Sequence, residues 1–219
     1  MERWVLLRKG ADFEAIGKKY QISPRLACLI RNRDVIGEEA VDRYLNGTIS
    51  DLYDGMLMKD MDKAIDILKE KILEDKKIRV IGDYDIDGVN ATYILLEGLE
   101  RLGADVDSDI PDRISDGYGL NRHLVERAYE AGVDTLITCD NGIAAADEIA
   151  YGKEMGMTVI VTDHHEVPFD EHDGEKRYRI PPADAVMDPK QPDCLYPFKG
   201  LCGAAVAYKM MEALWESMG

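Results

Sequence analysis

The fold class follows from residues 78–88, which read IRVIGDYDIDG. This stretch opens with a short β-branched run, which predicts a strand that ends at Gly82. Three aspartates follow the glycine, and a helical pattern then continues through Leu95, Leu99 and Leu102. A strand that leads through an acidic turn into a helix is the first half of a βαβ unit.

The same alternation continues toward the C-terminus. Strands are predicted at 106–110, 135–139, 158–162 and 185–187, and helices at 121–131, 144–155 and 201–217. Strands that alternate with helices predict an α/β fold, a mostly parallel β-sheet with helices on both faces. Residues 163–184 are rich in His, Asp, Glu and Pro and are predicted to form a long loop, and loops of this length are often functional.

The first 75 residues are predicted to be helical. Ser23 is a predicted N-cap with Pro24 at the first helical position, residues 37–45 form a short amphipathic helix, and residues 60–74 form a long one. We therefore expect a helical N-terminal lead-in at 1–75, packed on an α/β domain at 76–219.

Charge is distributed unevenly along the 219 residues. The chain holds 27 basic and 43 acidic residues, a net charge of −16. Residues 1–60 hold 10 of each sign, whereas residues 61–219 hold 17 basic and 33 acidic residues. A surface this acidic repels nucleic acid unless its negative charge is locally offset. The acidic side chains are therefore either exposed to solvent or bind cations.

The composition also indicates the cellular compartment of the protein. No apolar run approaches the ~18 residues of a membrane span, and the N-terminal apolar stretch is too short for a signal peptide, so no membrane association is expected. The four cysteines are widely spaced, which favours a cytoplasmic protein with reduced thiols.

Polar side chains follow three of the predicted strands directly. They are Asp83, Asp85 and Asp87 after the first strand, Asp140 after the third, and Asp163, His164 and His165 after the fourth. The carboxyl ends of parallel strands meet at one edge of a sheet, where active sites of this architecture lie. So many carboxylates need a compensating positive charge, and two Mn²⁺ or Mg²⁺ ions would supply it. This pattern points to metal-dependent phosphoester hydrolysis.

Each of these motifs taken alone has a simpler explanation. A D-x-D after a strand is often a turn or a helix cap, Asp140-Asn141-Gly142 is an ordinary turn sequence, and a His pair is usually on the surface. Residues 85–89 also match the D-x-D-x-V motif of haloacid-dehalogenase-type phosphatases, in which Asp85 would carry the phosphoryl group, but that chemistry gives the His pair no role.

The motifs resemble those of the DHH phosphoesterase superfamily, and most closely RecJ-type single-strand-specific 5′→3′ exonucleases. The three main motifs lie at 82–88, 137–143 and 161–166. Further marks lie at 110–113, 117–120, 188–189 and 196–203, and in the helical lead-in at 26–33 and 61–64.

The resemblance implies roles for individual residues. The implied metal ligands are Asp85, Asp87, Asp140 and His164, with Asp83 either a ligand or a group that contacts one. His165 would contact the substrate phosphate or protonate the leaving oxygen, and Asp163 would orient a histidine. Arg113 would hold a phosphate, although an ion pair with Asp112 or Asp116 is the simpler explanation for it. In the glycine-rich turn before the last helix, the backbone at Gly203 would approach a phosphate.

The implied activity is two-metal hydrolysis, in which a bridging hydroxide releases 5′-mononucleotides from single-stranded DNA in DNA repair or recombination. Two departures from the family qualify it. The turn usually reads G-V-G-V, whereas Ala204 and Ala205 follow the glycine here. The family also has a further metal-binding aspartate and a nucleic-acid-binding domain beyond the last helix, and Asp188 does not match that ligand.

We therefore expect a fragment truncated before both features, with reduced or absent activity, or a short relative with an incomplete site. The alternatives that stay open are a phosphodiesterase for short oligonucleotides or cyclic dinucleotides, and a catalytically incomplete binding module. Protein partners in DNA repair are not indicated by the sequence.

Overall fold

The computed structural model describes residues 3–5, 9–114, 117 and 119–219. The chain divides into two compact units, Met1–Leu52 and Tyr53–Gly219. Each unit has its own buried residues.

The first unit is helical, as the sequence predicts. Its described elements are α1 (Phe13–Tyr20), α2 (Pro24–Asn32), α3 (Glu38–Asn46) and the 3₁₀ turn η1 (Ile49–Asp51). The predicted cap of α2 is confirmed, because the Ser23 hydroxyl accepts a hydrogen bond from the Leu26 N–H at 3.2 Å and Pro24 is the first helical residue. The sequence analysis did not single out α1, which Asp12 caps through the Ala15 N–H.

The second unit is built on a five-stranded sheet. Its strands are β1 (Ile78–Ile81), β2 (Val106–Asp109), β3 (Thr135–Cys139), β4 (Thr158–Thr162) and β7 (Ala185–Met187). The order is β2-β1-β3-β4-β7, and every neighbouring pair is parallel. All five strands lie within a residue of their predicted positions, which confirms the parallel α/β fold.

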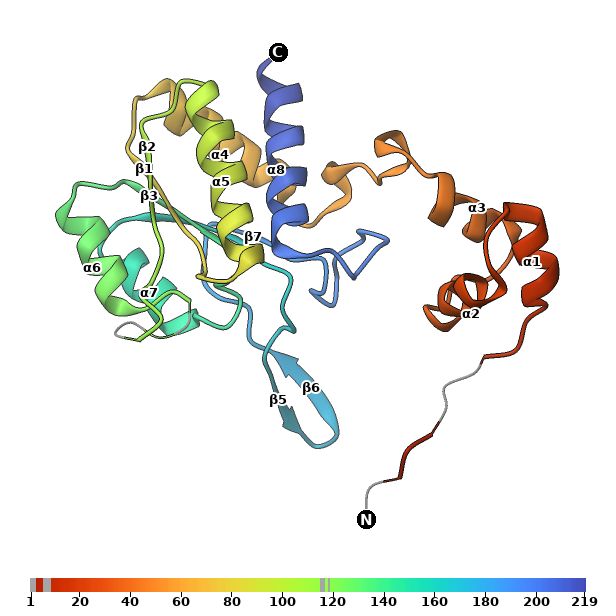
Figure 1. Ribbon diagram of the computed structural model, residues 1–219. Helices are drawn as coiled ribbons and strands as arrows, with labels where there is room; N and C mark the ends of the chain where they lie inside the picture. Colours follow the sequence, from red (N-terminus) through yellow and green to blue (C-terminus); the bar gives the residue numbers. More distant parts are fainter. Residues whose placement is uncertain (1–2, 6–8, 115–116, 118) are drawn as a thin grey trace. The chain divides into compact units, whose positions relative to one another are not determined.

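Helices cover both faces of this sheet (Figure 1). They are η2 (Gly55–Leu57), α4 (Met61–Leu73), α5 (Ile86–Arg101), α6 (Arg122–Glu130), α7 (Ala146–Glu154) and α8 (Gly203–Met218). Successive strand residues point to opposite faces, so Val80 packs in the core under α4, α5 and α8, and Ile81 packs in the core under α6 and α7.

Helix α4 belongs to the second unit, although the sequence analysis assigned its residues to the N-terminal lead-in. Leu68 and Ile65 are buried in the same core as Val80 of β1 and Leu99 of α5. Judged by which residues pack together, the boundary between the two units lies after Leu52, upstream of this helix.

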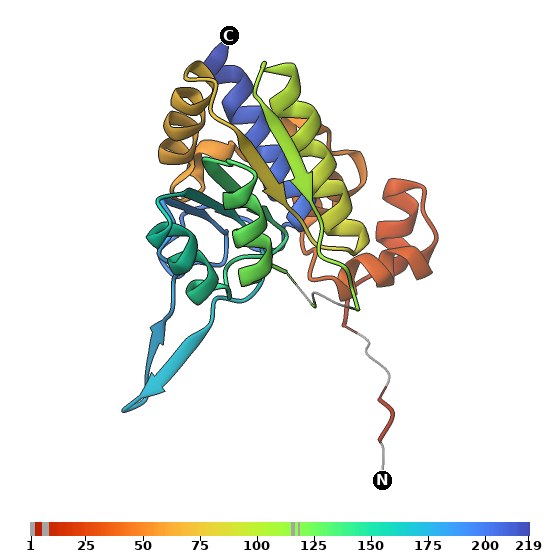
Figure 2. The ribbon, with the colours of Figure 1, turned by 90° about the vertical axis from the view of Figure 1, so that its left-hand side faces the viewer.

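The prediction of an unbroken loop over residues 163–184 is wrong at eight positions. Strands β5 (Phe169–His172) and β6 (Glu175–Tyr178) form an antiparallel hairpin that extends away from the sheet (Figures 1 and 2). Its turn is Asp173-Gly174, and both residues have a positive φ, 54° and 80°. An Asp-Gly turn of this type is a strong hairpin signal, but all eight strand residues are exposed, so no burial pattern marks the strands.

Among the described residues, we find no helix with the length and apolar character needed to cross a membrane.

Candidate metal centre

The strand order changes direction between β1 and β3, and ligands bind at such a point outside the carboxyl ends of the strands. Asp83 follows the last residue of β1 after one glycine. Asp140, Asp163 and Asp188 are each the first residue after β3, β4 and β7. Parallel pairing therefore delivers four buried carboxyl groups to one edge of the sheet.

The turn after β3 fixes Asp140 through its backbone. Asp140 has a φ of 59°, a left-handed conformation that is rare outside glycine and tolerated best by Asn and Asp. The amide of Asn141 ties the turn to both strands, because it donates to the Ile81 carbonyl at 3.1 Å and to the Cys139 carbonyl at 2.9 Å. Gly142 completes the turn at a φ of 112°, where a Cβ would lie 2.3 Å from the Thr138 hydroxyl.

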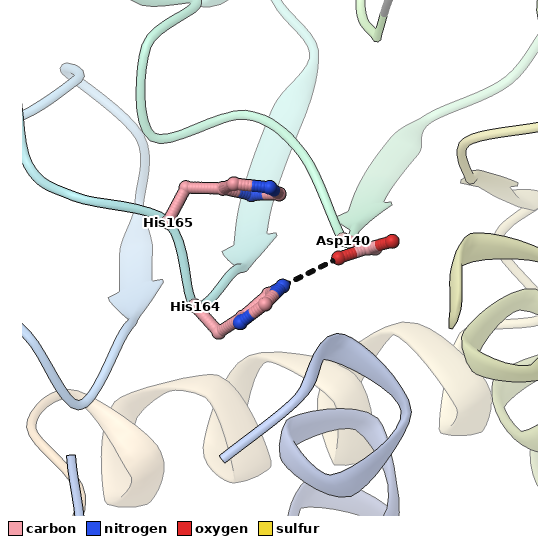
Figure 3. Close-up of side chains that lie close together, drawn as sticks. All are labelled: Asp140, His164 and His165. Atoms are coloured by element: carbon pink, nitrogen blue, oxygen red, sulfur yellow. Dashed lines mark ion pairs between the residues drawn. The ribbon is translucent and has the colours of Figure 1, made fainter. Parts of the chain in front are cut away.

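Three predicted metal ligands converge on one point. The His164 Nε2 lies 2.9 Å from Asp140 Oδ1 and 3.5 Å from Asp87 Oδ2. Figure 3 shows the Asp140 carboxylate and the two histidine rings in one cluster, with the His164–Asp140 pair dashed. Neighbouring ligands around an octahedral ion at about 2.1 Å lie about 3 Å apart, so this spacing suits a shared divalent cation.

A second group of oxygens lies beside the first. Asp83, Asp85 and Asp140 each offer a carboxylate oxygen, and these atoms lie within 4.8 Å of one another. Asp83 is buried, and its Oδ1 has no hydrogen-bond partner among the residues that the structure describes. Asp85 is exposed and caps α5, its Oδ1 accepting from the backbone N–H of Asp87 and of Gly88. Asp140, His164 and His165 form the other compatible group, so Asp140 belongs to both.

Asp163 lies behind His165 and holds it. Its Oδ1 is 2.7 Å from His165 Nδ1 and also accepts from the His164 N–H, while its Oδ2 accepts from the Ile143 N–H at 2.9 Å. The hydrogen bond that His165 makes to the Asp163 carboxylate raises the pKa of His165, against the opposing effect of burial. The contact is compatible with the orienting role that the sequence analysis expected of Asp163, and that role stays a prediction.

Asp87 is held by the first turn of α8. Its two carboxylate oxygens accept from the N–H groups of Gly203 at 2.6 Å and Ala204 at 2.8 Å. Burial alone would raise the pKa of Asp87, but these two hydrogen bonds, together with Cys202 and His164, keep the pKa below its ordinary value. The Gly203 N–H, which the sequence analysis assigned to a substrate phosphate, therefore has a protein carboxylate as its partner.

The pKa of Asp140 shifts in the opposite direction. Burial raises its pKa to about 7, and the nearby carboxylates of Asp87 and Asp85 add to the effect. A neighbouring cation stabilises the ionised form of a buried carboxyl group that is surrounded by like charges. Hard oxygen ligands with one or two imidazoles suit Mn²⁺ or Mg²⁺, so the residues present fit the predicted ions.

Arg113 contacts a residue of the turn that follows β1. Its guanidinium stacks over the Tyr84 ring, 5.2 Å from the ring centre, and Tyr84 lies between Asp83 and Asp85 in the chain. The alternative partner Asp112 accepts a hydrogen bond from the Ile114 N–H. Asp116, the other alternative, and Tyr118 of the 117–120 motif lie outside the described residues.

Asp188 is a further candidate, which the sequence analysis named within a family motif but did not assign to the metal site. It is fully buried, its Oδ1 accepts from the Lys190 N–H at 2.7 Å, and its Oδ2 has no hydrogen-bond partner in the described part of the chain. Burial raises its pKa to about 7. The rule that found the other aspartates, a carboxylate directly after a strand, would have found this one after β7.

Solved structures and curated sequences resemble this chain. RecJ from Thermus thermophilus in complex with Mn²⁺ matches with a TM-score of 0.66 and 31% identity, over 99% of this chain and 29% of that one. A second structure, exonuclease RecJ bound to manganese, matches with a TM-score of 0.63 and 37% identity, over 74% of this chain and 39% of that one.

Among curated sequences, the single-stranded-DNA-specific exonuclease RecJ of Bacillus subtilis (strain 168) is 40% identical over 213 residues, which is 97% of this chain and 26% of that protein. RecJ of Escherichia coli (strain K12) is 31% identical over 215 residues, 98% of this chain and 35% of that protein. The chain thus spans about a quarter to a third of the length of these relatives. The model of the DHH family, N-terminal domain, matches residues 77–218, and the chain therefore belongs to the DHH family.

Proposed function

We propose that this chain is the metal-dependent phosphodiesterase part of a RecJ-like exonuclease, which acts on single-stranded DNA in the 5′→3′ direction and releases 5′-mononucleotides. The observation that carries the proposal is the convergence of Asp83, Asp85, Asp140 and His164 at the carboxyl edge of the sheet. The similarity to single-stranded-DNA-specific exonucleases supports the choice of substrate.

The two groups of ligand atoms suit two divalent cations. Asp83 and Asp85 would hold one ion and His164 the other, with Asp140 between them and Asp87 beside the second. Ions bound there would lower the pKa of a water molecule and offset negative charge on the phosphate. Manganese and magnesium are both candidates, because RecJ from Thermus thermophilus has been solved with each.

His165 and Arg113 would handle the substrate. Asp163 engages Nδ1 of His165, which fixes the ring and leaves Nε2 as the nitrogen that contacts the phosphate or gives a proton to the leaving oxygen. The Arg113 guanidinium can hold a phosphate through two parallel hydrogen bonds. Gly203 contributes less directly than expected, since its N–H holds Asp87.

We place the reaction in the cytoplasm and in DNA repair or recombination. All four cysteines are free thiols, which fits a reducing compartment.

The test is Mn²⁺-dependent release of mononucleotides from a 5′-labelled single-stranded oligonucleotide, with duplex DNA and a dinucleotide as comparison substrates. We expect release from the single strand at a rate below that of a full-length RecJ, none in EDTA, and none from the Asp140→Asn variant. Cleavage of duplex DNA alone would contradict the exonuclease assignment, and cleavage of the dinucleotide alone would favour the short-substrate alternative. Mn²⁺ binding without any cleavage would favour a binding module.

A further inference from the structure

The N-terminal turn of α8 is in contact with two of the proposed metal ligands. Two successive N–H groups, of Gly203 and Ala204, donate to opposite oxygens of Asp87, 2.6 and 2.8 Å away. Such N–H groups have no partner within their own helix and favour an anion. Here the anion is a side chain from α5, more than a hundred residues earlier in the chain.

The same turn lies against Asp140. A Cβ added at Gly203 would lie 2.5 Å from Asp140 Oδ1 and 2.7 Å from both Cβ and Cγ of that residue. Real Cβ atoms do not approach other atoms so closely, so a side chain here would have to displace either Asp140 or α8. Asp140 has little freedom to move, because its turn is tied to β1 and β3 by Asn141.

We propose that the first turn of α8 is a positioning element of the metal centre, in which Gly203 and the Ala204 N–H set where the carboxylates of Asp87 and Asp140 lie. The inference rests on the proposed function, since it assumes that these carboxylates bind divalent cations. Neither residue touches the ion in this arrangement, and both act through the aspartates. Side-chain volume at position 203 would therefore weaken cation binding without removing any ligand.

The test is a calorimetric titration of the 219-residue chain with Mn²⁺ alone. We expect Gly203→Ala to bind Mn²⁺ roughly 10- to 100-fold more weakly than the wild type, the usual loss when a group that orients a metal ligand is disturbed. The matched control is Gly152→Ala in α7, where a Cβ would make ordinary contacts of 3.5 and 3.7 Å with Val125 and Val159. This control should bind Mn²⁺ like the wild type.

A second variant separates the two contacts and covers the case in which Gly203→Ala does not fold. Ala204→Pro removes one N–H donor to Asp87 without adding bulk beside Asp140, and proline is tolerated in the first turn of a helix. We expect weaker Mn²⁺ binding with an unchanged circular dichroism spectrum. If a folded Gly203→Ala or, failing that, Ala204→Pro binds Mn²⁺ within twofold of the wild type, the inference is overturned. If the wild type binds no Mn²⁺, the proposed function itself has failed.

Discussion

Asp140 combines an unusual backbone conformation with an unfavourable electrostatic position. Its left-handed φ of 59° turns the chain back at the end of β3, and its carboxyl group is buried beside Asp85 and Asp87. Residues held in this way cost stability and are retained where the site requires them. The account therefore predicts opposite effects on stability and on metal binding when the charge alone is removed.

Asp140→Asn should raise the stability of the metal-free chain at pH 8 by about 1 kcal/mol, because asparagine tolerates a positive φ and carries no charge. The same variant should lose Mn²⁺ binding. Urea unfolding in EDTA and a Mn²⁺ titration would measure the two effects. Asp140→Ala is the control, since alanine tolerates this φ less well, and a loss of stability in Asp140→Asn as well would contradict the account.

The pH dependence of stability should follow from the same groups. Asp140 and Asp188 have folded-state pKa values of about 7, above the ordinary 3.8, so the folded chain binds protons more tightly than the unfolded chain between these values. Their stabilising contribution is complete below pH 3.8 and is lost as the pH rises to about 7. The raised pKa of His165 acts in the same direction.

We therefore expect the metal-free chain to have a larger free energy of unfolding at pH 5 than at pH 8, by at least about 1 kcal/mol. The difference should shrink in Asp140→Asn and in saturating Mn²⁺. Denaturant unfolding at the two pH values measures it. A free energy that increases from pH 5 to pH 8 in EDTA would show that these carboxyl groups are not buried as described.

The buried elements were predictable from the sequence, and the exposed hairpin was not. Strands β1, β3 and β4 can be recognised in the sequence as β-branched runs, because they are buried on both faces of the sheet. The hairpin of β5 and β6 buries none of its residues, so only the Asp173-Gly174 turn distinguished it from a loop.

The hairpin should add little to the stability of the second unit. Replacing residues 169–178 with a short glycine linker is expected to change the free energy of unfolding by less than about 1 kcal/mol, because exposed residues contribute little. By contrast, Leu99→Ala in α5 removes a fully buried side chain and should cost about 2–5 kcal/mol. Thermal and urea unfolding would compare them, and a linker variant as unstable as Leu99→Ala would contradict this reading.

The sequence predicted those residues of the candidate site that come directly after a strand. Asp83, Asp140 and Asp163 were found because a parallel sheet gathers its carboxyl ends, and the same rule was not applied to Asp188. The hydrogen bonds between Asp87 and the first turn of α8 had no signal in the sequence. Their donors are backbone N–H groups, which nearly every residue type has, and they lie more than a hundred residues away in the chain.

The boundary between the parts of the chain is where sequence and packing differ most. The sequence placed it between residues 75 and 76, and this functional boundary stays a prediction. The packing places it after Leu52, since α4 buries Met61, Ala64 and Leu68 in the core of the second unit. Helical periodicity identified α4 correctly but carries no information about which core the helix joins.

A fragment comparison tests this division. Residues 53–219 should fold cooperatively by themselves, whereas residues 76–219 should not, because they lack the apolar face of α4 and expose the core beneath it. Circular dichroism and urea unfolding of the two fragments would decide. Cooperative folding of 76–219 with the stability of the longer fragment would show that α4 is dispensable.

In the proposed site, acidic and imidazole groups that follow β1, β3 and β4 meet around divalent cations. Anomalous diffraction from crystals of the chain soaked in Mn²⁺ would locate these ions. The account predicts manganese peaks within bonding distance of Asp83, Asp85, Asp140 and His164, with Asp87 beside them. Crystals in which these side chains are ordered but no manganese lies among them would contradict it.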